Sequence, residues 1–215
     1  MQTSYSIHRL VHAWGYDRLQ GDRDEVERFW YAASQLLDDY VKTVSDRQDG
    51  PVSKLRVVPH LTDSIHGFKR VSTVNNWNKI DWLETVERFG LFFVEIGRWN
   101  DAALSEREVL EKRQRILGDK HPDTISAMSN LAITLSDQGR LDEAALMMKE
   151  VLEKRQRILG DEHPDTTWAA EYLRYILSAL IAGPSDTSTT KKQPFLKRVT
   201  GKLQQVRDLF RSHPN

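Results

Sequence analysis

The chain has 215 residues, and its 31 Lys and Arg residues balance 31 Asp and Glu residues, so the formal net charge is zero. This balance excludes a global field that would draw the protein to nucleic acid or to an acidic surface. Cysteine is absent, which excludes disulfides and thiolate metal sites and fits a reducing compartment. With 29% charged residues and few strand-like alternations, the composition is typical of soluble amphipathic helices.

The start of the chain shows no basic leader and no apolar run of signal-peptide length. Nowhere does an apolar run approach the roughly 20 residues that a transmembrane helix needs. We therefore expect a cytoplasmic protein.

Residues 1–50 are expected to form an N-terminal helical segment. Apolar residues at helical spacing predict a short helix from about Tyr5 to Leu19, ending near Gly21. A second helix is predicted from Arg23 to Val44, because its apolar positions keep the 3.6-residue period over about six turns. The charged, Gly- and Pro-containing segment 46–51 indicates a turn or a short linker.

Residues 51–80 are expected to form a connecting helical segment. Apolar residues between Lys54 and Phe68 predict a broken helical piece, because Pro59 lacks an amide hydrogen and disfavours helix at Val58. Residues 71–79 show no clear period and are expected to connect this piece to the next part of the chain.

One segment occurs twice in the following part. Residues 108–124 read EVLEKRQRILGDKHPDT and residues 150–166 read EVLEKRQRILGDEHPDT, so 16 of 17 positions agree at an offset of 42 residues. Self-similarity at a fixed period of this size is typical of a solenoid, in which each unit buries its apolar face against its neighbours. The array is expected to cover residues 81–182.

Each unit is predicted to be a pair of helices. The first helices are expected at about 82–96, 123–138 and 165–181, and the second helices at about 100–117 and 142–159. A glycine follows each complete helix, and Gly118 and Gly160 are expected at left-handed positions just past the second helices. Pro122 and Pro164 then mark the restart of the next helix. Asn100 and Asp142 are the predicted caps of the second helices.

The segment 130–166 resembles the tetratricopeptide repeat of the long kind seen in kinesin light chains and in many fungal and bacterial NB-ARC or NACHT proteins. Its small and large signature positions are occupied, and its proline comes about 8 residues later than in the common 34-residue form. The resemblance implies an all-α, right-handed α-solenoid of antiparallel helix pairs. It also implies a non-catalytic scaffold that binds a peptide or a protein in a concave groove lined by the first helices.

Equivalent positions of the first helices are the candidates for that groove, because they recur with the period while their identities change. In the resembled family an asparagine at the place of Asn130 often hydrogen-bonds the main chain of a bound peptide. The groove candidates are Arg88, Phe92, Glu95, Asn130, Thr134, Asp137, Tyr172 and Ile176.

A second resemblance concerns the beginning of the chain. Residues 6–14, SIHRLVHAW, look like the close of the winged-helix region of fungal NB-ARC and NACHT proteins, and residues 56–61 are similar to a later segment of the same proteins. The chain contains no G-x-x-x-x-G-K-[ST] phosphate-binding loop. An alternative function is therefore that of a regulatory or sensor fragment of such a receptor-like NTPase without its nucleotide-binding core.

A basic amphipathic helix is predicted at residues 194–213, after a flexible linker at residues 183–193. Its apolar residues repeat every three to four positions, and its candidate binding residues are Lys197, Arg198, Lys202 and Arg207. Such a helix can lie on an anionic membrane, enter a partner's groove or cap the open end of the solenoid. The interrupting Gly201 and the modest apolar face favour capping over the membrane.

No catalytic, cofactor or metal site is predicted. His121 and His163 recur inside the same turn, which favours a structural role, and the His8 and His12 pair has no third ligand nearby. The repeated EKRQR blocks mix charges, so a solvated helix face is favoured over nucleic-acid binding. Because stacked repeats generally need about three units, self-association is a further possibility with only two and a half.

Overall fold

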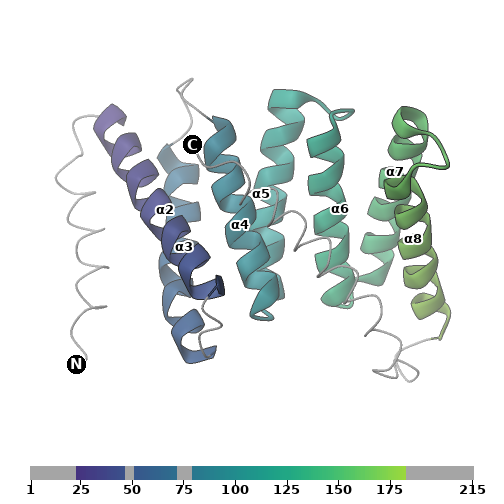
Figure 1. Cartoon of the computed structure of the whole chain (residues 1–215), viewed down its shortest axis with the longest axis horizontal. Helices are drawn as coiled ribbons and strands as arrows, with labels where there is room; N and C mark the ends of the chain where they lie inside the picture. The colour runs from purple at the N-terminus through teal and green to yellow at the C-terminus, as the bar shows by residue number, and fades with distance from the viewer. Residues whose placement is uncertain (1–22, 47–50, 72–78, 183–215) are drawn as a thin grey trace. The chain divides into compact units, whose positions relative to one another are not determined.

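The computed structural model describes residues 23–46, 51–71 and 79–182, and every element in these ranges is a helix (Figure 1). The order is α2 (Arg23–Asp46), α3 (Pro51–Val71), α4 (Lys79–Glu95), α5 (Trp99–Leu117), α6 (Pro122–Asp137), α7 (Leu141–Leu159) and α8 (Pro164–Ala182). The all-α class predicted from the sequence is confirmed. The short helix expected at Tyr5–Leu19, the linker at 183–193 and the tail helix at 194–213 lie outside the described residues.

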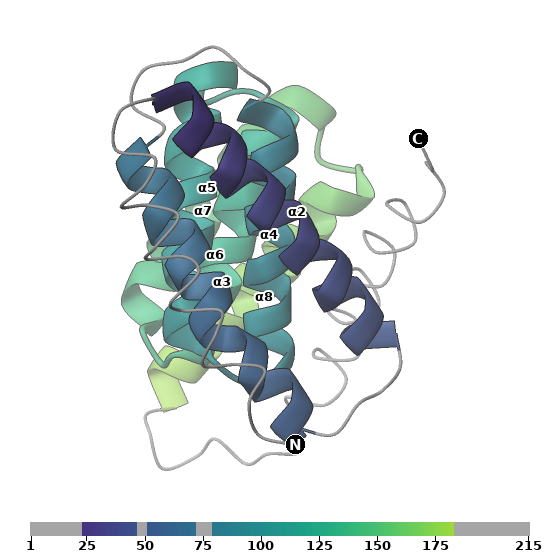
Figure 2. The same ribbon diagram turned by 90° about the vertical axis from the view of Figure 1, so that its left-hand side faces the viewer.

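The chain forms two compact units, Met1–Ala127 and Met128–Asn215, whose boundary falls inside α6. In the first unit α2 pairs with α3, α4 pairs with α5, and α2 also packs against α4 (Figures 1 and 2). In the second unit α7 packs against α8. The core consists of the apolar faces of these helices, with fully buried Leu61, Val86 and Phe89 in the first unit and Met148, Val151 and Ile176 in the second.

Glycines end the first helices of the repeats as predicted. Gly97 and Gly139 have φ values of 74° and 80°, which place them in the left-handed region. After α6, the Arg140 amide donates to the Leu135 carbonyl at 2.9 Å and the Gly139 amide donates to the Ser136 carbonyl at 3.0 Å. These two bonds form a Schellman motif, which satisfies carbonyls that the helix end leaves unpaired.

Gly118 and Gly160 follow the second helices in a different conformation from the one predicted. Their φ values of 86° and 85° are positive, but their ψ values of 165° and 167° are extended. The sequence predicted a left-handed helical conformation for both glycines, and their ψ values show that this prediction is wrong. This extended region with positive φ is open essentially only to glycine, so the requirement for glycine is even stricter than the sequence indicated.

The predicted caps of α5 and α7 are also wrong. Arg98 and Arg140 occupy the N-cap positions, and neither makes a side-chain capping hydrogen bond. Each arginine is at once the residue after a Schellman glycine and the residue before the next helix, because the turn is so short. Asn100 and Asp142 consequently lie within the first turn and not at the cap, while Arg140 Nε binds the Glu143 carboxylate at 2.7 Å.

The helix α3 is continuous through Pro59, in contrast to the broken piece expected. A proline in a helix interior costs about 3 kcal/mol because one hydrogen bond is lost and the ring crowds the carbonyl four residues earlier. Here Pro59 is exposed, and Leu55, which carries that carbonyl, is 48% exposed, so the bond is lost on the solvent side. Buried Val57, Val58 and Leu61 on the other face supply tertiary packing that offsets the cost.

Two arginines of the repeated EKRQR blocks are buried, although a solvated face was expected. Arg113 and Arg155 are 9% and 7% exposed. Each donates from Nη1 to a main-chain carbonyl at the start of the following helix, Arg113 to Asp123 at 3.2 Å and Arg155 to Asp165 at 3.0 Å. The repeated arginine therefore ties the end of one helix to the beginning of the next.

Candidate functional site

In the first unit, the groove candidates contact other parts of the chain. Arg88 forms two hydrogen bonds with the buried Asp38 carboxylate of α2, from Nε at 2.6 Å and from Nη2 at 2.8 Å. Glu95 accepts a hydrogen bond from Lys54 of α3, and Phe92 is 2% exposed. The helices α2 and α3 thus occupy the polar candidates of this unit.

In the second unit the candidates divide by burial. Thr134, Tyr172 and Ile176 are buried, so a ligand can reach little of these side chains. Asn130 and Asp137 on α6 are partly exposed.

Three aromatic residues of α8 form a row that includes the candidate Tyr172. The Trp168 and Tyr172 rings are stacked, with centroids 5.3 Å apart and an interplanar angle of 8°. The Tyr172 and Tyr175 rings follow at 5.8 Å and 38°. Because the spacing is four and then three residues, the three rings share one side of the helix. We call Trp168, Tyr172 and Tyr175 the aromatic row.

Polar groups of α6 lie at the Tyr175 end of the aromatic row. Tyr172 makes a side-chain hydrogen bond with Ser136. Burial raises the pKa of the Tyr172 phenol, the Ser136 bond acts in the opposite direction, and the Asp137 charge raises it further. Burial and the Asp137 charge also raise the pKa of the partly exposed Tyr175. The Asp137 carboxylate therefore gives this end of the row a negative charge.

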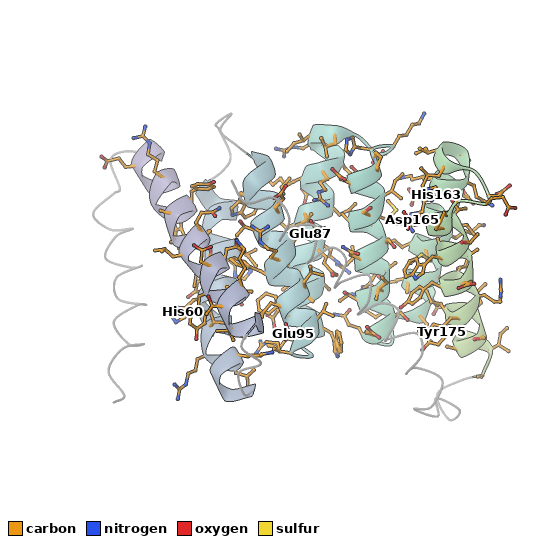
Figure 3. The ribbon with its side chains drawn as sticks, viewed as in Figure 1. His60, Glu87, Glu95, His163, Asp165 and Tyr175 are labelled. Atoms are coloured by element: carbon orange, nitrogen blue, oxygen red, sulfur yellow. The ribbon has the colours of Figure 1, made fainter. Side chains whose placement is uncertain are left out.

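A cation lies at the other end. The Arg155 guanidinium is placed over the Trp168 ring, 5.9 Å from its centroid, a distance that permits a cation–π interaction. Burial lowers the pKa of Arg155, and the nearby Asp165 carboxylate partly counters this effect. Figure 3 shows Asp165 and Tyr175 toward opposite ends of α8. The Arg155 end of the row therefore holds a buried cation beside the Asp165 carboxylate, whereas the Tyr175 end lies near the Asp137 carboxylate.

Such an arrangement suits binding. The partly exposed rings of Trp168 and Tyr175 supply contact area with little loss of side-chain entropy, and the partly exposed Asp137 carboxylate can attract a cation of a bound chain. In the described ranges, no three His, Cys, Asp or Glu side chains come together as a possible metal site. No helix in the described part of the chain is long and apolar enough to cross a membrane.

The two repeated histidines take part in helix starts. The His163 Nδ1 atom accepts a hydrogen bond from the Asp165 amide at 3.1 Å, and His121 does the same for Asp123 at 3.2 Å. Each ring thus satisfies an amide in the first turn of α8 or α6 that has no partner within the helix. This geometry supports the structural role predicted for both residues.

Sequence reasoning missed Trp168, Tyr175, Ser136 and Arg155. The aromatic spacing at positions 168, 172 and 175 was the available signal, since residues four and three apart share a helix face. The predicted tail residues Lys197, Arg198, Lys202 and Arg207 lie outside the described residues, as do His8 and His12.

The helix pairs, the Schellman glycines and the repeated arginine bonds together define a helical repeat protein. Residues 88–123 and 124–165 match the family model of the tetratricopeptide repeat. No curated protein matches the chain.

Solved structures of similar arrangement include BtubC (BKLC) from P. vanneervenii, with 12% identity and a TM-score of 0.49 over 80% of this chain. The match covers 63% of the BtubC chain, so the present chain spans less than two thirds of that protein. Two structures of a putative kinesin light chain with nearly identical TPR-like repeats, from Podosopora anserina, each have a TM-score of 0.45. Their identities are 14% and 15%, over 87% and 88% of this chain and 97% and 96% of theirs.

Proposed function

We propose that the protein is a non-catalytic scaffold that binds a peptide or protein segment along the aromatic row. The proposed site consists of Trp168 and Tyr175 of the row, the Asp137 carboxylate of α6 that acts on Tyr175, and Asn130 two turns earlier on α6. Tetratricopeptide repeats generally mediate protein–protein interactions, and the match to residues 88–165 supports this class of function. We further propose that the protein works in the cytoplasm.

The observation that carries the proposal is the placement of partly exposed aromatic rings beside a carboxylate. Trp168 and Tyr175 are each partly exposed, and the Asp137 charge acts on the Tyr175 phenol. Aromatic residues in such surroundings are typical hot spots of interfaces. A basic segment would place its cation near Asp137 and would offer its backbone to the Asn130 side chain.

A peptide-display selection against the purified full chain tests the proposal. Enriched peptides should lose about tenfold or more in affinity for the Asn130→Ala, Asp137→Ala double variant, measured by calorimetry. Trp168→Ala should weaken the same peptides further.

The matched control is Gln114→Ala with Glu153→Ala, which also removes one amide and one carboxylate. Both side chains are exposed and lie on second helices, and neither belongs to the aromatic row or to α6. The control variant should bind like the unaltered protein. Peptides that bind all variants equally would show that the aromatic row is not the binding surface.

The alternative function, that of a regulatory or sensor fragment of an NB-ARC or NACHT receptor-like NTPase, stays a prediction. The segment 6–14 that carries most of that resemblance lies outside the described residues, and residues 56–61 lie within α3. Genomic sequence upstream that encodes a phosphate-binding loop would support it.

A further inference from the structure

The last described helix, α8, has an apolar face that differs from its packed face. Ala169, Tyr172 and Ile176 are buried, and α8 packs against α7. Leu177 and Ile181, by contrast, are 45% and 88% exposed. The partly exposed Ala170, Leu173 and Leu180 lie on the same side as these two residues, and the five together form what we call the outer face of α8.

The equivalent positions in the earlier repeats are covered. Leu173 corresponds to Phe89 and Leu131, which are 0% and 2% exposed. Leu177 corresponds to Phe93 and Leu135, both 1% exposed. In the first unit, α4 bears two of these residues and packs against its own second helix, α5. A first helix of this repeat therefore normally buries this face, and a second helix for α8 is not among the described residues.

The chain after α8 carries a matching pattern. Its apolar residues Leu196, Val199, Leu203, Val206 and Phe210 are spaced three, four, three and four residues apart. On the outer face, Ala170, Leu173, Leu177 and Leu180 are spaced three, four and three apart. Stripes of this spacing on two helices interdigitate when the helices pack nearly antiparallel.

The length of the segment 183–193 and the charge of the tail are both compatible with this pairing. The segment 183–193 can span up to about 36 Å when extended, whereas α8 is about 28 Å long. An antiparallel helix at 194–213 would begin near the end of α8, whose last turn has no basic residue. Lys191, Lys192, Lys197 and Arg198 would then lie beside the negative end of the α8 dipole.

We propose that residues 194–213 form a helix that docks antiparallel on the outer face of α8 and completes a third helix pair. The occupant is this chain's own tail. Its attachment to α8 gives it an effective local concentration in the millimolar range, which a second copy in dilute solution does not match.

Paired cysteines test the proposal directly, because the chain contains no cysteine of its own. The Leu177→Cys, Val199→Cys variant of the full chain should form a disulfide within one chain at least about tenfold faster than the Ser178→Cys, Val199→Cys control. Ser178 is exposed and lies about 100° further round α8 from Leu177. Monomeric cross-linked chains on a non-reducing gel are the expected product. Disulfide-linked dimers, or equal rates in the two variants, would overturn the proposal.

Amide hydrogen exchange gives a second test that needs no cross-link. Leu203→Asp should speed exchange in α8 at least about tenfold, while Gln204→Asp, one residue round the tail helix, should leave it unchanged. A membrane role predicts another result with anionic vesicles. If Leu203→Asp abolishes vesicle binding and leaves exchange in α8 unchanged, the tail serves the membrane and the proposal is wrong.

Discussion

At the scale of single residues, two buried arginines show how a repeat is held together. Arg113 bonds both oxygens of Glu87, at 3.2 and 2.9 Å, in addition to the Asp123 carbonyl. Among the contacts described above, Arg155 bonds the Asp165 carbonyl, and its guanidinium also lies over the Trp168 ring. The planar guanidinium makes several directed bonds at once, which a lysine ammonium cannot reproduce.

We therefore expect Arg113→Lys to lower the free energy of unfolding by about 2 kcal/mol, and Arg155→Lys by about 1 kcal/mol. Urea denaturation measures both values. Arg115→Lys is the matched control, because Arg115 is exposed on the same helix and should change stability by no more than about 0.5 kcal/mol. Equal losses for all three variants would contradict the role of the buried bonds.

Tyr172 makes stability sensitive to alkaline pH. Its pKa is raised mainly by burial, whereas a tyrosine in the unfolded chain titrates near about 10. Above that pH the unfolded chain releases a proton that the folded protein retains, so stability falls as the pH rises. Tyr172→Phe should make this fall shallower in urea titrations between pH 9 and 11, despite a loss of about 1 kcal/mol at neutral pH.

Tyr175→Phe serves as a graded comparison. The pKa of Tyr175 is also raised by burial, but the side chain is partly exposed. Its replacement should flatten the alkaline fall less than that of Tyr172. Identical pH slopes in all three proteins would show that burial of Tyr172 does not govern the effect.

At the scale of helices, glycines play opposite roles that one substitution can distinguish. Gly139 ends α6 at a φ of 80°, where a side chain is strained. Gly90 lies inside α4, and a Cβ there would meet Ser105 and Glu106 at an ordinary 3.5 Å. Gly139→Ala should therefore destabilise the protein by about 1 kcal/mol, and Gly90→Ala should stabilise it by up to about 1 kcal/mol. Thermal unfolding of the two variants measures the sign, and a shared sign would refute this assignment.

At the scale of the molecule, α2 and α3 belong with the repeats of the first unit. They form a helix pair, and α2 packs on α4 through Asp38, whose carboxylate is fully buried. That carboxylate accepts bonds from Arg88 and also lies 2.9 Å from Lys42 Nζ. Among its described residues, the first unit thus contains two successive helix pairs, α2 with α3 and α4 with α5, followed by the beginning of α6.

Asp38→Ala should lower the free energy of unfolding by about 3 kcal/mol, because it leaves the partly buried Arg88 without its carboxylate. Its neighbour Asp39 is 73% exposed and pairs only loosely with Lys42, at 3.5 Å. Asp39→Ala should therefore cost less than about 0.5 kcal/mol. Chemical denaturation monitored by circular dichroism compares the two, and equal losses would show that the buried pair does not hold α2 to α4.

The sequence by itself determined the helices of the repeats and the approximate positions of their ends. The 42-residue period, the prolines at Pro122 and Pro164 and the glycines after the repeat helices are local signals, and the observed repeat helices begin and end within three residues of the predicted positions. These signals are reliable because a helix end depends on the conformation of one or two residues.

Only the tertiary structure decided which polar and aromatic residues are buried and what they contact. Arg113 appears solvent-exposed from its charged neighbours, α3 appears broken at Pro59, and Arg88 appears available to a ligand. Each outcome depends on packing against another helix: Arg113 against Glu87 of α4, α3 against α2, and Arg88 against Asp38 of α2. Helix periodicity fixes which side of a helix a residue lies on, whereas its burial is fixed by the neighbour that covers that side.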